Sequence, residues 1–296
     1  MLNLSRRLEP TNHKFQDTEN YNPQSKFMSV RNKLIILKLG GSVITHKSSG
    51  RKMVNRKNLE RLSLELSRAQ KKEKFSIIII HGVGSFGHII AGKFKLNDGF
   101  KNKKQVKVIP LLRGDLEKLN TKVIKTLMEN KLNTMAVHPS SLWTLNNRRL
   151  KNANLDMIKN LLKLELTPVL YGDILTDSKL GFSILSGDQI VYYLAKKLNA
   201  VKVIVGTDVD GVFDANPKIN KGAKLIKEIN KHNVKQFCVN ASTAVDVTGG
   251  MGGKINELLK LANFGIESEI INISKQGILE KSLRGKKGIG TLIVPA

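Results

Sequence analysis

One short segment, His81 to His88, combines three glycines with two histidines directly after an apolar run. That run, residues 77–80, is four isoleucines long and is typical of a strand buried on both faces. The glycines therefore stand where a strand passes into a helix. Glycine lets the backbone approach an anion closely, and the N–H groups of the first helical turn point toward it. The segment predicts a phosphate-binding loop in which His88 hydrogen-bonds a phosphate oxygen, while His81 packs at the strand end.

A second glycine turn of the same kind lies upstream. The sequence Lys38-Leu39-Gly40-Gly41-Ser42 continues the apolar stretch 34–37. Two phosphate loops on two strands suggest two phosphorylated molecules that face each other, which is what a kinase requires. A buried strand end is an unfavourable place for Lys38 unless its ammonium meets an anion. The alternative is a lysine that extends from the strand end to solvent.

Phosphoryl transfer also needs cations around the moving phosphoryl group. Lys254 follows a run of glycines at a predicted helix start, where the helix dipole adds to its charge. Lys47 is a weaker candidate, because many lysines of this chain belong to its surface. Asp188 opens another predicted helix, and it either complements that helix dipole or orients Lys38 and Lys254 or a metal ion. The sequence predicts no set of metal-binding side chains.

The glycine spacing bears on other nucleotide-binding motifs. No Gly-x-x-x-x-Gly-Lys-Ser/Thr sequence is present, which excludes a Walker loop. Gly82, Gly84 and Gly87 do match the pattern Gly-x-Gly-x-x-Gly, which is weak evidence for a dinucleotide enzyme. Ribose binding would require an acidic residue at the end of a second strand about 20 residues further on. The sequence does not supply one, because Asp98 lies in a polar turn.

The elements that position these residues alternate between apolar runs and helical periodicity. We predict strands at 34–39, 75–81, 134–137, 167–171, 201–205, 268–273 and 291–294, and helices at 56–71, 105–131, 154–163, 187–198 and 251–264. This alternation predicts an α/β fold with a mainly parallel sheet covered by helices. A turn-rich segment at 177–181 suggests a first half at 33–177 and a second half at 178–296. Residues 1–32 are polar and aperiodic, and we expect a flexible extension.

Composition limits the alternatives. The chain has 296 residues and a formal net charge of +26, a field that attracts nucleic acid, anionic membranes or phosphorylated metabolites. The basic residues are spread along the chain without interleaved aromatics, which favours a lysine-rich solvated surface over a nucleic-acid site. The single cysteine, Cys238, excludes an intramolecular disulfide. No apolar run approaches the roughly 20 residues of a membrane-spanning helix, and no secretory signal begins the chain, so we expect a cytoplasmic protein.

The order of these motifs resembles the amino acid kinase superfamily, and within it the isopentenyl phosphate kinases. The resemblance covers Lys33 to the C-terminus, and its specific part is the ending Gly84-Ser85-Phe86-Gly87-His88. The superfamily, which includes glutamate, acetylglutamate, aspartate and uridylate kinases, shares most of the other motifs. Those motifs are Lys38 to Ser42, Ile44 to Lys47, Tyr171 to Asp173, Ile184 to Asp188, Thr207 to Val212 and Asp246 to Lys254. Val83 departs from the pattern, because family members often have glycine there.

The resemblance implies a three-layer αβα sandwich with an open sheet, usually dimeric, with ATP in the C-terminal half and the acceptor in the N-terminal half. The expected cofactors are ATP and Mg²⁺. It implies that His88 holds the acceptor phosphate, and that Lys38 and Lys254 contact the ATP phosphates. Lys47 would assist at the transferring group. The implied acceptor-binding residues are Val83, Gly84, Gly87, His88 and Gly187. The implied ATP-binding residues are Lys38, Gly40, Gly41, Ser42, Gly84, Thr207, Asp208, Asp210, Gly211, Gly250 and Lys254.

The implied activity is transfer of the ATP γ-phosphate to isopentenyl phosphate, which gives isopentenyl diphosphate in a mevalonate-type pathway of isoprenoid biosynthesis. An isoprenoid tail offers only apolar surface. Ile89, Ile90 and Phe94 are candidates to contact it, or else they form the core face of a helix. The alternatives are a related kinase for another small phosphate or phosphonate, such as a fosfomycin-type compound, and a nucleic-acid-binding or regulatory protein on a kinase fold.

Overall fold

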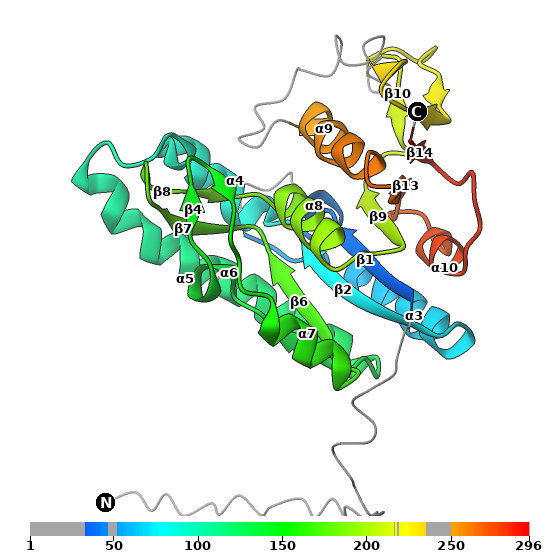
Figure 1. Cartoon of the computed structure of the whole chain (residues 1–296), viewed down its shortest axis with the longest axis horizontal. Coiled ribbons are helices and arrows are strands. Elements are labelled where there is room, and N and C mark those ends of the chain that lie inside the picture. The colour runs from blue at the N-terminus through cyan, green and yellow to red at the C-terminus, as the bar shows by residue number, and fades with distance from the viewer. Residues whose placement is uncertain (1–32, 47–51, 216, 218, 235–249, 296) are drawn as a thin grey trace, which may run out of the picture. The chain divides into compact units, whose positions relative to one another are not determined.

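The apolar runs of the sequence form the central strands of one sheet. The computed structural model describes residues 33–46, 52–215, 217, 219–234 and 250–295. Among these residues, eight strands form a sheet in the order β12-β14-β13-β9-β1-β2-β6-β3 (Figure 1). They are β1 (Lys33–Leu39), β2 (Phe75–His81), β3 (Thr134–Ala136), β6 (Thr167–Tyr171), β9 (Lys202–Thr207), β12 (Glu228–Ile229), β13 (Glu267–Asn272) and β14 (Thr291–Ile293). Every neighbouring pair is parallel except β13 and β14, so the predicted mainly parallel sheet is confirmed.

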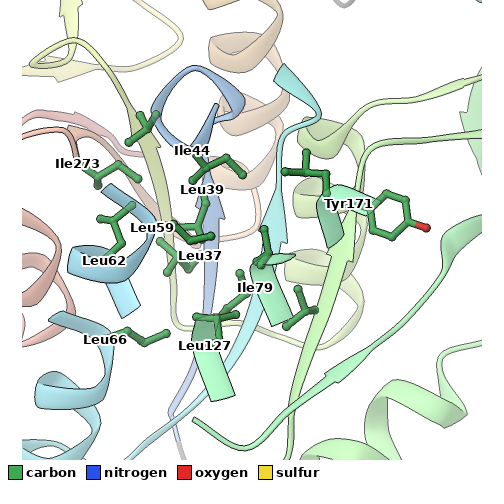
Figure 2. Close-up of a cluster of buried hydrophobic side chains, with 14 of the residues drawn as sticks. Leu37, Leu39, Ile44, Leu59, Leu62, Leu66, Ile79, Leu127, Tyr171 and Ile273 are labelled. Atoms are coloured by element: carbon green, nitrogen blue, oxygen red, sulfur yellow. The ribbon is translucent and has the colours of Figure 1, made fainter. Parts of the chain in front are cut away.

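Helices cover both faces of this sheet. They are α2 (Gly41–Ile44), α3 (Arg56–Lys72), α4 (Gly84–Lys93), α5 (Lys103–Glu129), α6 (Pro139–Leu142), α7 (Asp156–Lys163), α8 (Gly187–Lys197), α9 (Gly250–Ala262) and α10 (Ile278–Leu283), with a 3₁₀ turn at Leu96–Asp98. Side chains of a strand alternate between its faces. Leu37 and Ile79 therefore pack with α3, α5 and α10 (Figure 2), and Ile36 and Ile78 pack with α7, α8 and α9. The three-layer αβα sandwich is confirmed.

The periodic leucines of α3 show how the layers are held. Leu59, Leu62 and Leu66 recur at spacings of three and four, and each is at most 2% exposed. They face Leu37 and Leu39 of the central strand (Figure 2). Complete burial of one such side chain stabilises the fold by roughly 1.5–3 kcal/mol. The apolar packing of α3 thus fixes the position of β1, the strand that leads into the first glycine loop.

A second, smaller sheet was not predicted. Its strands β4 (Leu145–Asn146), β5 (Arg149–Leu150), β7 (Asp173–Asp177) and β8 (Gly181–Leu185) have the order β5-β4-β7-β8. A two-stranded ribbon pairs β10 (Val212–Phe213) with β11 (Leu225–Ile226). Several of these strands are two residues long, which is too short for any periodicity to register. The segment 177–181 is the turn of the β7–β8 hairpin.

The predicted elements are otherwise present, with ends that differ from the structure by at most two residues. Helix α10 was missed, because its six residues are too few for a helical repeat to show. The described residues from Lys33 onward belong to one compact unit, and the division into halves at 177/178 stays a prediction. The expected extension at 1–32 and Cys238 lie outside the described residues. None of the helices described has the length and apolar character needed to cross a bilayer.

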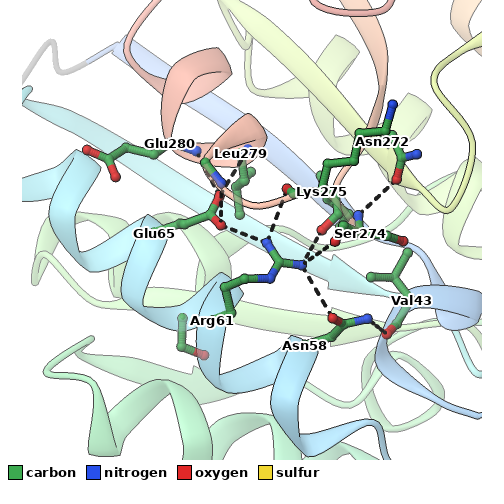
Figure 3. Close-up of polar contacts among 12 residues, drawn as sticks. Val43, Asn58, Arg61, Glu65, Asn272, Ser274, Lys275, Leu279 and Glu280 are labelled. Atoms are coloured by element: carbon green, nitrogen blue, oxygen red, sulfur yellow. Dashed lines mark hydrogen bonds and ion pairs between the residues drawn. The ribbon is translucent and has the colours of Figure 1, made fainter.

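The connection from β13 to α10 is held by two charged residues of α3 (Figure 3). Arg61 donates a 2.6 Å hydrogen bond to the carbonyl of Ile273 and pairs with Glu65 at 2.7 Å. The fully buried Glu65 carboxylate accepts from the N–H groups of Gly277 and Leu279 at 2.9 and 3.1 Å. Amide groups at a helix start have no partner within the helix. Glu65 supplies that partner from a neighbouring helix.

Candidate active site

The two predicted glycine loops meet because their strands are neighbours. Strands β1 and β2 pair in parallel, so both carboxyl ends lie at the same edge of the sheet. The Gly40 N–H donates to the carbonyl of Gly206, near the end of β9, at 2.9 Å. A Cβ atom on Gly41 would lie 2.5 Å from the amide nitrogen of Gly84, and one on Gly82 would lie 2.5 Å from that of Gly41. Only glycine allows this backbone contact, which brings the two loops together.

Thr45 joins the same two loops through its hydroxyl. Its Oγ1 donates to the Gly41 carbonyl at 2.7 Å and accepts from the Ser85 N–H at 3.1 Å. The side chain is 1% exposed. Gly84, the first residue of α4, has a φ of +47°, a conformation that favours glycine. The start of α4 is therefore fixed against the first loop, with its N-terminal amides at the strand edge.

A cavity of about 420 Å³ lies over these strand ends. The predicted site residues that line it are Lys38, Gly40, Gly41, Ser42, Val83, Gly84, Gly87, His88, Gly187, Asp188, Thr207, Asp208 and Lys254. Asp210, Gly211 and Gly250 are not among its lining residues, and Lys47 lies outside the described residues. The structure thus gathers residues that are as far apart in the chain as Lys38 and Lys254 around one space.

Lys38 and Asp188 form an ion pair in the wall of the cavity. Lys38 Nζ lies 2.6 Å from Asp188 Oδ2, and the two side chains are 8% and 11% exposed. Asp188 stands in the first turn of α8, as predicted, and the Ser186 hydroxyl caps that helix by accepting from the Gln189 N–H. A buried ammonium needs a charged partner, so Asp188 orients Lys38. Lys254 Nζ donates instead to the Gly250 carbonyl at 3.2 Å.

The two acidic residues that follow β9, Asp208 and Asp210, have different positions: Asp208 lines the cavity and Asp210 does not. Asp208 accepts a 2.8 Å hydrogen bond from the Ser42 hydroxyl. Asp210 pairs with Lys275 at 2.6 Å and also accepts from Asn272. The hydrogen bond from Lys275 lowers the pKa of Asp210. Asp210 therefore ties the loop after β9 to the end of β13.

The cavity lining also includes apolar side chains. Of the three candidates to contact an isoprenoid tail, Ile89 lines the cavity and is 54% exposed. Ile90 and Phe94 instead pack against the hydrophobic core. The other apolar lining residues are Val83, Ala91, Leu112, Leu116, Ile174, Ile184, Leu185, Val209 and Met251. The periodicity of α5 placed Leu112 and Leu116 on one helix face, but periodicity does not identify what that face meets. The smaller sheet contributes Ile174 and Ile184 to this lining.

Sequence reasoning assigned no role to Arg113, which contacts a residue of the cavity wall. Asp173 lines the cavity and is 2% exposed. Arg113 of α5 lies 3.3 Å from its Oδ2, and the Ser140 N–H donates to the same oxygen at 3.2 Å. Burial raises the pKa of Asp173, against the opposing effect of Arg113. This cluster attaches α5 to the start of β7.

His81 packs at the strand end, as predicted. It is fully buried, it stacks on Tyr171 with ring centroids 5.4 Å apart, and its Nε2 lies 3.1 Å from Asn120 Oδ1. Burial lowers the pKa of His81, which favours the neutral ring. His88, by contrast, is exposed and lines the cavity. The structure therefore separates the two histidines of the motif into a core residue and a cavity residue.

The sequence and the fold of this chain are similar to those of known kinases. A sequence model of the amino acid kinase family matches residues 33–272. The chain is 38% identical to an isopentenyl phosphate kinase of Methanothermobacter thermautotrophicus over 88% of its length and 98% of the relative. It is 34% identical to one of Methanocaldococcus jannaschii over 86% of its length and 96% of the relative. A crystal structure of an isopentenyl phosphate kinase superposes with a TM-score of 0.77 at 37% identity, over 88% of this chain and all of the other.

Proposed function

Because the chain belongs to the amino acid kinase family, with isopentenyl phosphate kinases among its relatives, we propose that it transfers the ATP γ-phosphate to isopentenyl phosphate. The products are ADP and isopentenyl diphosphate, an intermediate of isoprenoid biosynthesis. The observation that carries the proposal is the composition of the cavity. Its lining combines glycine loops and lysines with ten apolar side chains, among them Ile89, Leu112 and Ile184.

The apolar lining favours an isoprenoid acceptor over an amino acid. Burial of a methylene group contributes about 0.8 kcal/mol, so a five-carbon tail gains useful affinity from Ile89, Leu112 and Ile184. An amino acid acceptor would bring charged groups against the same side chains, and a charged group buried without a partner is strongly unfavourable. This contrast separates the proposal from the glutamate kinases of the superfamily.

The mechanism requires positioning and charge neutralisation rather than a general base. A phosphate monoester has a second pKa of about 6, so most of the acceptor already carries its nucleophilic oxygen deprotonated at pH 7. His88 and the first amides of α4 would hold that phosphate. Lys38, oriented by Asp188, and Lys254 would neutralise the charge that spreads over the transferring oxygens. Lys47 keeps its predicted role at the transferring group.

Mg²⁺ fits the residues of this cavity as an ion that arrives with ATP. Mg²⁺ retains several waters and usually takes one or two carboxylates in addition to phosphate oxygens. Asp188 and Asp208 are carboxylates on the cavity wall, and either is suited to hold the hydrated ion. Within the described part of the chain, no group of three or more His, Cys, Asp or Glu side chains is arranged to hold a metal without ATP. When bound, Mg²⁺ offsets the negative charge of the ATP phosphates.

The homodimer and the cytoplasmic location also remain part of the proposal. The family resemblance supports the homodimer. Helix α5 exposes Leu111 and Val106 by 68% and 49%, and these side chains are candidates for a surface covered by a second copy. Sedimentation analysis of the purified chain at two ionic strengths tests the dimer, because the charge of +26 opposes self-association at low salt.

A panel of acceptors tests the activity. Purified protein with ATP and Mg²⁺ is offered isopentenyl phosphate, glutamate, UMP and fosfomycin, and ADP release is measured. We expect turnover with isopentenyl phosphate to exceed the others by at least about 100-fold in kcat/KM, the discrimination expected from a few kcal/mol of differential binding. Equal or greater turnover with another acceptor would replace the proposed substrate. Salt-sensitive RNA binding with no turnover of any acceptor would favour the nucleic-acid alternative.

Two matched pairs of variants test the assignment of residues. His88→Ala should lower kcat/KM for isopentenyl phosphate by about 100-fold or more, while His232→Ala, in an exposed turn, should not change it. Ile89→Asn should raise the acceptor KM about fivefold to tenfold, because it removes apolar contact from the cavity. Leu64→Asn is its control, since Leu64 is similarly exposed at 47% but lies on α3 away from the cavity. Equal effects within either pair would remove that residue from the site.

A further inference from the structure

A bidentate ion pair joins the smaller sheet to α9, the helix that carries Lys254. Arg149 of β5 donates through both terminal nitrogens to Glu257 of α9, at 2.6 and 3.2 Å. The two residues are 108 positions apart in the chain. Glu257 is 9% exposed, so solvent screens the pair only in part. A planar guanidinium that meets a carboxylate in this way fixes orientation as well as distance.

Helix α9 needs such an external contact at its start. Its first four residues include three glycines, Gly250, Gly252 and Gly253, and each weakens a helix by roughly 0.5–1 kcal/mol relative to alanine. Lys254 follows them directly, and Glu257 lies one turn further on. Side chains three positions apart on a helix are neighbours on its surface. A contact that holds Glu257 therefore also holds the turn that presents Lys254 to the cavity.

The segment that carries Arg149 is bonded to α8, a helix whose first turn lines the cavity. After β5, the Tyr193 hydroxyl of α8 donates to the Lys151 carbonyl at 2.6 Å and accepts from the Ala153 N–H at 2.9 Å. The first turn of α8 carries Asp188, which orients Lys38. Helix α8 thus serves as a common support for Arg149 and Lys38.

We propose that Arg149 is a positioning residue for the nucleotide, because its bidentate contact with Glu257 holds α9 so that Lys254 faces the ATP phosphates. This inference rests on the proposed function, in which Lys254 contacts those phosphates. It assigns a catalytic consequence to a residue that touches neither substrate. It also predicts that the two substrates respond differently, because none of the proposed acceptor contacts belongs to α9: they lie on α4, α5, the β7–β8 hairpin and, at Gly187, the start of α8.

Loss of Arg149 should leave the fold intact. Lys260 also pairs with Glu257, at 3.2 Å, so a variant at position 149 does not leave that carboxylate without a cation. The Arg149 side chain is 42% exposed, and partly exposed ion pairs contribute little to stability. A change in nucleotide binding can therefore be separated from a change in folding.

The experiment compares Arg149→Met with Arg148→Met. Arg148 is the neighbouring residue, is similarly exposed at 46%, and approaches Asp98 only at 3.8 Å. In the steady-state assay, we expect Arg149→Met to raise the KM for ATP about fivefold to tenfold, with the acceptor KM changed less than about twofold. Arg148→Met should leave both values unchanged, and both variants should melt within a few degrees of the wild type.

A charge exchange and a binding measurement complete the test. Arg149→Glu with Glu257→Arg should recover part of the ATP affinity that Arg149→Glu alone loses. Calorimetric titration with MgATP gives the same comparison without an acceptor, so it still tests the inference if the wild type fails to phosphorylate isopentenyl phosphate. An unchanged ATP affinity in folded Arg149→Met, or an equal rise in both KM values, would overturn the inference.

Discussion

The ammonium of Lys38 and the carboxylate of Asp188 are 2.6 Å apart where the end of β1 meets the start of α8. This contact explains why a lysine can end a buried strand, since the carboxylate compensates its charge. A lysine ammonium has three N–H donors, so it can bind Asp188 and a phosphate oxygen at once. The pair is therefore suited to hold a cation at a fixed point beside a transferring phosphoryl group.

Asp188→Asn should reduce catalysis more than stability. The amide keeps the shape of the side chain but no longer fixes the Lys38 ammonium by charge, so we expect kcat to fall about 10-fold to 100-fold, measured by ADP release. Asp156→Asn is the control, because Asp156 also stands in the first turn of a helix but is 73% exposed. If both variants keep wild-type kcat, Asp188 serves only as a helix-terminal charge.

Thr45→Val should separate the two glycine loops without a change of side-chain shape. Valine is β-branched like threonine but lacks the hydroxyl that bonds to both Gly41 and Ser85. We expect a loss of about 1–3 kcal/mol in the free energy of unfolding and a rise in the KM of both substrates. Thr45→Ser keeps the hydroxyl and should restore most of the activity. Failure of the serine variant to exceed the valine variant would exclude the hydrogen bonds as the cause.

Local sequence patterns predicted the mainly parallel sheet covered by helices and the two glycine loops of the cavity, because both depend on short segments. The αβα sandwich and lining residues such as Gly187 and Thr207 were expected from the family resemblance. A run such as Ile77–Ile80 reveals a buried strand, and glycines after it reveal a loop that must approach something closely. The parallel order of the strands then brings those loops to one edge of the sheet. The predictions that succeed are those in which one segment determines its own role.

The remaining features depend on which segments meet. Asp210 belongs to a motif beside Asp208, yet its carboxylate pairs with Lys275 and does not line the cavity. Asn272 at the end of β13 and Lys275 just after it, 62 and 65 residues further along the chain, hold Asp210 away from the cavity lining. The sequence likewise presents Arg113 as one more basic residue of a long helix, and only the packing of α5 against the start of β7 brings it to Asp173. The residue spacing around Asp210 or around Arg113 does not show which distant segment each will contact.

Asp177 should make stability depend on acid pH. Burial opposes its ionisation, but hydrogen bonds from the Arg148 N–H and the Ser183 hydroxyl outweigh burial and lower its pKa from 3.8 to about 2. A carboxylate whose pKa is lowered in the folded state stabilises the fold above its unfolded pKa and loses that effect as pH falls. We therefore expect about 2 kcal/mol to disappear between about pH 4 and pH 2. Urea unfolding across this range should show a flatter profile for Asp177→Asn than for wild type or Asp156→Asn.

Glu65→Gln should destabilise the protein through α10. Gly277 and Leu279 donate to different carboxylate oxygens, so the single amide oxygen of glutamine keeps only one of these two bonds, and its NH2 group faces the other donor. The change also removes the charge that pairs with Arg61. Breaking a buried pair on one side costs several kcal/mol, and because Arg61 is 18% exposed we expect about 2–3 kcal/mol from thermal or urea unfolding. Glu60→Gln, an exposed change on the same helix, should be neutral. Equal unfolding free energies for the two variants would show that α10 does not depend on the buried charge.

Gly41→Ala should disrupt the site through backbone contact alone. The added Cβ would lie 2.5 Å from the amide nitrogen of Gly84, so the two loops must move apart and the start of α4 must move with them. Gly114→Ala is the matched control, because no atom lies within 4 Å of a Cβ there and the residue is inside α5. Alanine in a helix interior is favoured over glycine by about 0.5–1 kcal/mol, so the control should become slightly more stable and keep its activity. If Gly41→Ala instead binds MgATP and isopentenyl phosphate with wild-type affinity by calorimetry, close approach of the two loops is not required for either phosphate.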